Sequence, residues 1–344
     1  MHTFTSLQGR CKASLRLLCL AGVLQVGCGG ESSTAPTTPT TPAVRPVIVT
    51  GRAVSNPGGT SVGGAQIIDA TRRVTLAATD GAGSFSFEYD GASSPIQVSV
   101  EAANHLTRVT QIARASHNVT IDLISLAPPF DLTYYQQLAR AALNNPTFNV
   151  NALGLGVWPR NPNFYLQTNL VDPGQAFRDI GQPVPQEAID RTVSGIPVIV
   201  SEVTGGRLQA GSIEMGPGWL HVNEPGWVTV AFFHRNDNPQ TYSGTGGNSG
   251  SGTRVMGRVI LGVHATRFAC PPISQGLIFH EMGHALGLFH IPTVGQPPNM
   301  MGGGMGETCD VAHFSSLESF HSTIMYSRPR GNQDPDTDPP DFVF

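Results

Sequence analysis

The stretch that decides the interpretation of this chain is HEMGHALGLFH, residues 280–290. On a helix, His280 and His284 lie one turn apart, so both imidazoles project from the same face toward one point. Glu281 follows the first histidine at a rotation of about 100° around the helix axis. It can therefore reach a water molecule at that point without binding a metal there itself. The spacing predicts a metal-binding helix with an adjacent carboxylate.

The second half of the stretch supplies a turn and a third ligand. Gly287 can adopt a positive φ at little cost, which ends the helix and turns the chain so that His290 approaches the same point. Three neutral imidazoles leave a fourth coordination position open, which is typical of a catalytic zinc site. The sequence therefore predicts His280, His284 and His290 as ligands of one Zn2+ ion. Glu281 is predicted to be the general base that takes a proton from a zinc-activated water.

The pattern H-E-x-x-H-x-x-G-x-x-H resembles the signature of the metzincin zinc metallopeptidases. The residues Ala-Leu-Gly-Leu that follow the second histidine, at positions 285–288, are similar to those of secreted bacterial metzincins and the matrixin branch. The resemblance implies an α/β (α+β) domain with a mixed twisted sheet and an active-site helix. It also implies a zinc metalloendopeptidase that hydrolyses peptide bonds of extracellular proteins. We place the methionine turn of this family at Met301, with Met325 as the alternative.

The first 45 residues indicate export. Residues 1–27 combine basic residues with an apolar run that is too short to span a membrane, as in a signal peptide of lipoprotein type. The small residue Gly27 precedes Cys28, which we expect to carry a lipid. Residues 28–45 form a Pro/Thr-rich tether that cannot bury a core. We predict an exported protein of a bacterial cell envelope, bound to the membrane through a lipid anchor at Cys28, with plain secretion as the alternative.

Composition excludes several classes of partner and chemistry. The net charge of −4 and the pI of about 6.2 offer no basic field for nucleic acid. The single lysine, Lys12, lies in the leader, so the mature chain cannot use Schiff-base chemistry or a P-loop lysine. The expected partner is a protein or peptide substrate.

Two cysteines flank the histidine motif. Cys270 and Cys309 remain after the leader cysteines and Cys28 are set aside. In an exported protein, we expect them to form a disulfide near the site, and two free buried thiols are the alternative.

Residues 46–127 are predicted to form a small all-β sandwich. Short alternating runs separated by Gly-rich turns indicate seven strands. The run resembles the carboxypeptidase-regulatory-like, transthyretin-like modules of exported bacterial proteins. No catalytic constellation stands out in it. The expected strands are 47–54, 66–69, 75–79, 84–89, 96–100, 108–112 and 119–124.

Residues 128–330 are predicted to form the peptidase domain. We expect helices over residues 131–143 and 185–200, the second bent or ended early by Pro197. Either 228–233 or 255–261 is expected to be the sheet edge beside the substrate, and 237–252 a mobile Gly-rich loop.

Residues 331–344 are predicted to be a solvated acidic, Pro-rich tail. Structural Ca2+ is an alternative for its aspartates that no ligand spacing supports.

Two alternatives to a peptidase remain for the function of the whole chain. They are a catalytically idle zinc-containing surface adhesin or binding lipoprotein, and a zinc hydrolase of non-peptide bonds.

Overall fold

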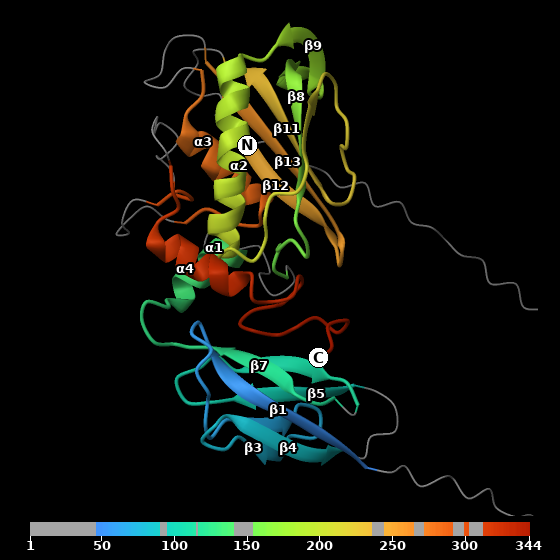
Figure 1. Cartoon of the computed structure of the whole chain (residues 1–344), viewed down its shortest axis with the longest axis vertical. Helices are drawn as coiled ribbons and strands as arrows, with labels where there is room; N and C mark the ends of the chain where they lie inside the picture. The colour runs from blue at the N-terminus through green and yellow to red at the C-terminus, as the bar shows by residue number, and fades with distance from the viewer. Residues whose placement is uncertain are drawn as a thin grey trace, which may run out of the picture. The chain divides into compact units, whose positions relative to one another are not determined.

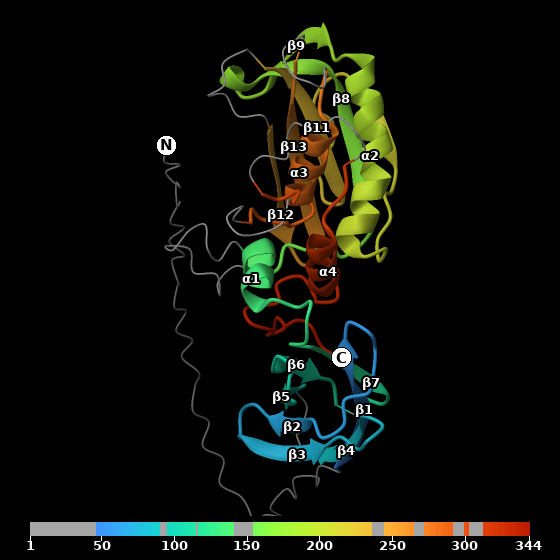
Figure 2. The same cartoon turned by 90° about the vertical axis from the view of Figure 1, so that its left-hand side faces the viewer.

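A computed structural model of the chain is shown in Figures 1 and 2. It describes residues 46–89, 95–114, 116–140, 154–235, 244–264, 272–291, 299–302 and 312–344, all within the compact unit Val44–Phe344. The expected leader and tether, with Cys28, lie outside these residues, as do Cys270 and Cys309. No helix in the described part of the chain is long and apolar enough to cross a membrane.

The first seven strands form two sheets around one apolar core. The sheet orders are β4-β1-β7 and β3-β2-β5-β6. Buried Ile67, Val98 and Ile121 belong to the shared core, as the period-two alternation of apolar residues requires. Each of the seven expected strands is confirmed to within two residues. They are β1 (Val47–Asn56), β2 (Gln66–Asp69), β3 (Val74–Ala78), β4 (Ser84–Tyr89), β5 (Ile96–Glu101), β6 (Arg108–Ile112) and β7 (Val119–Ile124).

A third sheet follows in the chain. Its strand order is β10-β8-β11-β13-β12, with β9 paired to β8 outside this path. The pairs β10–β8, β8–β11 and β11–β13 are parallel, whereas β12 is antiparallel to β13 and β9 to β8. The strands are β8 (Asn163–Asp172), β9 (Arg178–Pro183), β10 (Ile213–Gly216), β11 (Trp227–His234), β12 (Gly244–Ser251) and β13 (Arg254–Val263), and a 3-10 turn, η2 (Pro173–Gln175), precedes β9.

Different groups of residues pack against the two faces of this sheet. Val230 and Phe232 of β11 belong to the large core that also includes α2 (Gln186–Thr204) and α3 (Gln275–Ala285), whose packing along one face is visible in Figures 1 and 2. The intervening Ala231 and Phe233 face a smaller apolar cluster on the other side. Two further helices, α1 (Leu132–Arg140) and α4 (Ser316–Met325), contribute to the large core.

Pro197 does not end the second helix. α2 continues past it to Thr204, so the expectation of an early end is wrong. Ile196, Ile199 and Val200 are fully buried against the core. Tertiary packing of an apolar face supplies most helical stability in proteins, and here it outweighs the backbone hydrogen bond that proline cannot donate.

The prediction of fold class is also wrong. The sequence led us to expect a small all-β sandwich followed by an α/β (α+β) domain of metzincin type. The described residues instead form a mostly β structure, with thirteen strands in three sheets and four α-helices. From β8 to β13 the chain contains six strands and one α-helix, α2.

The edge of the third sheet lies where a mobile loop was expected. β12 occupies Gly244–Ser251, inside the predicted loop 237–252. Neither candidate edge strand lies at the edge, because β11 and β13 each have neighbours on both sides. The error arose because β12 has the sequence GTGGNSGS, which shows no apolar alternation.

The C-terminal segment is not a solvated tail. The backbone N–H of Val109 in β6 donates to the carbonyl of Asp336, and the N–H of Asp338 donates to Val109. Asp336 is fully buried and accepts two hydrogen bonds from the equally buried Arg328, at 2.7 and 2.8 Å. Asp338 pairs with Arg108 at 2.8 Å. Arginine side chains therefore neutralise both Asp336 and Asp338.

We expect Asp336→Asn to lower the free energy of unfolding by about 1–3 kcal/mol, because the buried Arg328 loses one of its two carboxylate partners and keeps only Asp122. Asp341→Asn is the matched control, since Asp341 is an exposed aspartate of the same segment and surface changes usually stay within about 0.5 kcal/mol. Denaturant unfolding of both variants checks this. Equal stability of the two would show that the buried pair contributes little.

Candidate metal centre

The helix that carries the first two histidines is defined by side-chain and backbone caps. Ser274 is its N-cap, and its Oγ accepts from the N–H of Leu277 at 3.1 Å. At the other end Gly287 has a φ of +98°. The N–H of Leu288 donates to Gly283, and that of Gly287 donates to His284. This is a Schellman motif, which explains why glycine ends the helix at this position. The expected role of Gly287 is confirmed.

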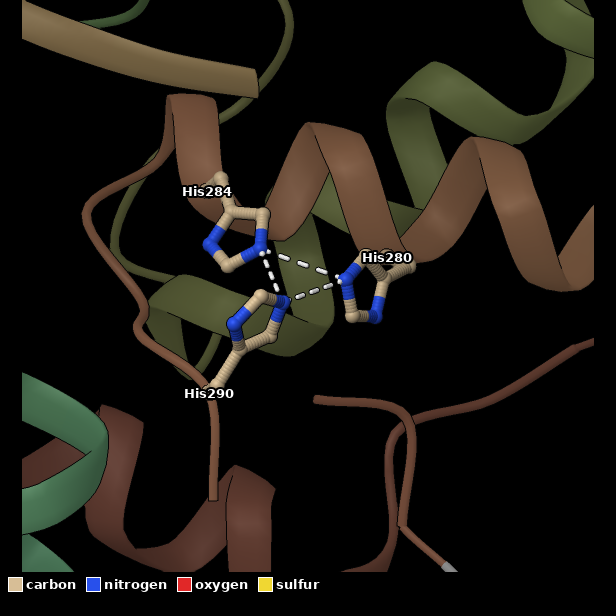
Figure 3. Close-up of side chains that lie close together, drawn as sticks. All are labelled: His280, His284 and His290. Carbon is tan, nitrogen blue, oxygen red and sulfur yellow. Dashed lines mark hydrogen bonds between the residues drawn. The ribbon is translucent and has the colours of Figure 1, made fainter. Parts of the chain in front are cut away.

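The turn after α3 brings three imidazoles together (Figure 3). The Nε2 atoms of His280 and His290 are 3.0 Å apart, those of His284 and His290 3.1 Å, and those of His280 and His284 3.2 Å. Zn–N bonds of about 2.0–2.1 Å at tetrahedral angles place ligand nitrogens about 3.3–3.4 Å apart. The observed triangle is close to that size. The three residues therefore form a group with the spacing that one metal ion requires.

The hydrogen bonds of the other ring nitrogens determine two of the tautomers. His280 Nδ1 lies 2.8 Å from the carbonyl of Met300, and His284 Nδ1 lies 2.7 Å from that of Leu288. A carbonyl only accepts, so both Nδ1 atoms carry the proton and both Nε2 atoms present lone pairs to each other. Lone pairs facing one another at 3.2 Å repel unless a cation lies between them. The donor set therefore fits a zinc ion.

Burial keeps these rings neutral. It lowers the pKa of His280. Burial, reinforced by the nearby His280, lowers the pKa of His284 to about 3 and also lowers the pKa of His290. Metal ligands must be deprotonated to bind, so a lowered imidazole pKa reduces proton competition for the site.

Glu281 lies in the same cleft as two of the histidines. A cavity of about 380 Å³ is lined by Glu281, His284 and His290 together with residues of β12. The Glu281 side chain is largely buried, and this burial raises its pKa to about 8. A carboxyl group with a raised pKa is suited to exchange protons near neutral pH.

The glycines of β12 allow this strand to approach α3. A Cβ added at Gly244 would lie 2.8 Å from Cγ and Oε1 of Glu281. A Cβ at Gly246 would overlap the carbonyl oxygen of Glu281. Gly247, one residue on, faces open space. Any side chain at the first two positions would push the strand away from the helix that carries the ligands.

Side chains from distant segments satisfy the last carbonyls of α3. Trp158 Nε1 and Asn248 Nδ2 donate to the carbonyl of Ala285 at 2.8 and 3.0 Å. The Tyr326 hydroxyl donates to the carbonyl of Leu286 at 2.7 Å. Without these donors, the two carbonyl groups would lack hydrogen-bond partners at the end of the helix. The bonds from Asn248 and Tyr326 also connect the end of α3 to β12 and to the end of α4.

The first helix, α1, holds the backbone of His290 in place. Gln137 of α1 donates from Nε2 to the backbone carbonyl of His290 at 2.7 Å. The N–H of Phe289 donates to the carbonyl of Leu138 at 2.7 Å. His290 lies beyond the end of α3, outside any helix or strand, so these two bonds supply the rigidity that its own segment lacks.

The two candidate methionines occupy different environments. Met301 is fully buried in a turn, and a Cβ added at Gly283 of α3 would lie 2.7 Å from its Sδ. It therefore lies directly against the helix that carries His280 and His284. Met325 is also fully buried but belongs to α4. The assignment of a methionine turn to Met301 stays a prediction.

Several residues that build the site were not identified from the sequence. Gln137, Trp158 and Asn248 act through backbone contacts between segments far apart in the chain, and no local pattern reports such contacts. Glu318 did have a local signal, the capping-box spacing Ser315-x-x-Glu318.

This chain shows little similarity to known proteins in sequence or in structure. No known protein family matches the chain, and no curated protein does. Two solved structures that match are interface mutants of a type II cohesin–X–dockerin complex from Acetivibrio cellulolyticus. The N-terminal interface mutant shows 22% identity, with a TM-score of 0.19 over 23% of this chain and 58% of that one. The C-terminal interface mutant shows 26% identity, with a TM-score of 0.16 over 24% and 55%. The match thus spans little more than half of those chains, and such low TM-scores carry no argument about fold or activity.

We expect Gly246→Ala to destabilise the protein by about 1–3 kcal/mol or more, because the new methyl group would overlap the backbone of Glu281. It should also reduce zinc content by displacing β12 from α3. Gly247→Ala is the matched control, with open space for its methyl group. Thermal unfolding and metal analysis of the two variants check this. Similar behaviour of both would show that the close strand–helix contact is not required.

Proposed function

We propose that this chain is a zinc-dependent endopeptidase that hydrolyses peptide bonds of extracellular proteins, with chemistry similar to that of the metzincins. The observation that carries the proposal is the triangle of Nε2 atoms from His280, His284 and His290, 3.0–3.2 Å apart. The cleft beside it also holds the buried carboxyl group of Glu281. The proposal concerns the site and its chemistry, because unrelated folds can carry the same catalytic group.

The roles of the residues follow from their positions. The three histidines would hold one zinc ion, which supplies Lewis acidity toward a carbonyl oxygen and makes a nearby water more acidic. Glu281 takes a proton from the attacking water as the new C–O bond forms. It returns that proton to the amide nitrogen as the C–N bond breaks, so that a carboxylic acid and an amine are released.

The edge of the third sheet favours a peptide as the substrate. Among the described strands, β12 pairs only with β13. Residues of β12 also line the cleft that contains Glu281. An extended peptide can add to such an edge through backbone hydrogen bonds, which would bring its carbonyl groups along the cleft. A small non-peptide ester or amide would not use this edge.

We expect Glu281→Gln to retain zinc and to lose proteolysis by about 10²–10⁴-fold, the usual contribution of a positioned general base. Casein hydrolysis and metal analysis on the purified protein, without leader and tether, check this. Glu88→Gln, at an exposed position of β4, should behave as wild type. His290→Gln should instead lower the zinc content, whereas His234→Gln, at the exposed end of β11, should not.

The same assays distinguish the alternatives. A zinc-loaded wild type without activity on casein or on peptide, ester and amide panels would indicate an idle zinc protein that acts in adhesion or binding. Activity confined to esters or non-peptide amides would indicate a different hydrolase. Full proteolysis by Glu281→Gln would contradict the proposed mechanism.

We also propose that the protein is held at a bacterial cell envelope through a lipid on Cys28. This rests on the basic and apolar leader and on the Pro/Thr-rich tether that follows Cys28. We expect Cys28→Ser to move the protein from the membrane fraction to the soluble or secreted fraction, as detected by immunoblotting. Cys309→Ser serves as the control and should remain in the membrane fraction. An unchanged distribution of Cys28→Ser would contradict the lipid anchor.

A further inference from the structure

A buried carboxylate lies behind the metal centre. Glu318, in the first turn of α4, is fully buried. In the described part of the chain, its hydrogen bonds come from backbone N–H groups. Oε1 accepts from Met301 at 2.7 Å, and Oε2 accepts from Met300 at 3.0 Å and from Ser315 at 2.7 Å. Burying a carboxylate is costly unless such bonds compensate for lost water, so this position calls for an explanation.

The Met300–Met301 peptide connects this carboxylate to a metal ligand. Its N–H group, on Met301, donates to Oε1 of Glu318. Its C=O group, on Met300, accepts the Nδ1 proton of His280 at 2.8 Å. One peptide unit is therefore hydrogen-bonded at both ends, to a carboxylate on one side and to an imidazole on the other. Hydrogen bonds in such a chain polarise one another, so the carboxylate makes the carbonyl a stronger acceptor.

We propose that Glu318 is a positioning residue that acts through the Met300–Met301 peptide to orient His280 and to strengthen it as a metal ligand. In many metal sites, a carboxylate bonds directly to the second ring nitrogen of a ligating histidine and raises its basicity. Here the peptide unit stands between the two groups and transmits the same effect. The inference rests on the proposed metal centre and adds a residue to it.

Helix capping alone does not account for this arrangement. Ser315 and Glu318 form a capping box, in which the Ser315 Oγ accepts from the N–H of Glu318 at 3.2 Å and the carboxylate accepts from the N–H of Ser315. That function occupies only one of the three bonds to the carboxylate. The other two hold the turn that supplies the acceptor for His280. The cap therefore explains the helix start but not the contact with residues 300–301.

The test measures metal affinity rather than proteolysis. We expect Glu318→Gln to weaken Zn2+ binding by about 10- to 100-fold, the usual effect of removing a partner behind a ligand. The affinity is measured by competition with a chromophoric chelator on the folded proteins, with circular dichroism as the check on folding. Ser315→Ala is the matched control. It removes the capping hydroxyl and lowers the unfolding midpoint, but it leaves the carboxylate–peptide contact in place, so its zinc affinity should stay within about twofold of wild type.

A second measurement on the wild type applies even where Glu318→Gln does not fold. Histidine 1H–15N spectra of the metal-free protein should show the His280 proton on Nδ1, protected from exchange by the bond to Met300. The inference is overturned if Glu318→Gln binds zinc like wild type, if Ser315→Ala weakens binding equally, or if the His280 proton lies on Nε2. A wild type that binds no zinc would overturn the proposed function as well. Zinc binding unaffected by Glu318→Gln would overturn only the role of Glu318.

Discussion

The candidate metal centre depends on holding three imidazole nitrogens within about 3 Å of one another against the repulsion of their lone pairs. Two of the rings have their tautomer determined by backbone carbonyls, of Met300 and Leu288, so their Nε2 atoms face inward without protons. A short helix does not enforce such a geometry, because side chains at its surface change rotamer easily. The rigidity must come from the segments around it, and the contacts of α3 show how it is supplied.

The three candidate ligands are supported by different parts of the fold. His280 is held through the peptide that Glu318 of α4 binds, and His290 through the contact of its carbonyl with Gln137 of α1. The end of α3 is tied to Trp158 and Asn248 through the carbonyl of Ala285. Because these supports lie far apart in sequence, the site can form only after the segments have packed. The motif is local, but its geometry is a property of the whole core.

The part of the site that the sequence predicts is the part encoded by local spacing. The helix over His280 and His284, the turn at Gly287 and the convergence of the histidines follow from helix periodicity and from the freedom of glycine at positive φ. The strands before Ile124 were predictable for a similar reason, since their apolar residues alternate. The fold class, the extension of α2 to Thr204 and the burial of Asp336 were not. They depend on tertiary contacts that override a local preference, such as the pairing of Asp336 with Arg328.

The glycine-rich strand shows why such a prediction fails beside a functional site. Toward α3, β12 must carry no side chain at Gly244 and Gly246, because the backbone and carboxyl group of Glu281 occupy that space. Along its other edge, it must leave backbone groups free if an extended substrate is to bind there. Both requirements favour small residues and remove the apolar alternation that identifies a strand. The segment that borders the cleft therefore resembles a linker in sequence because of the position that it occupies.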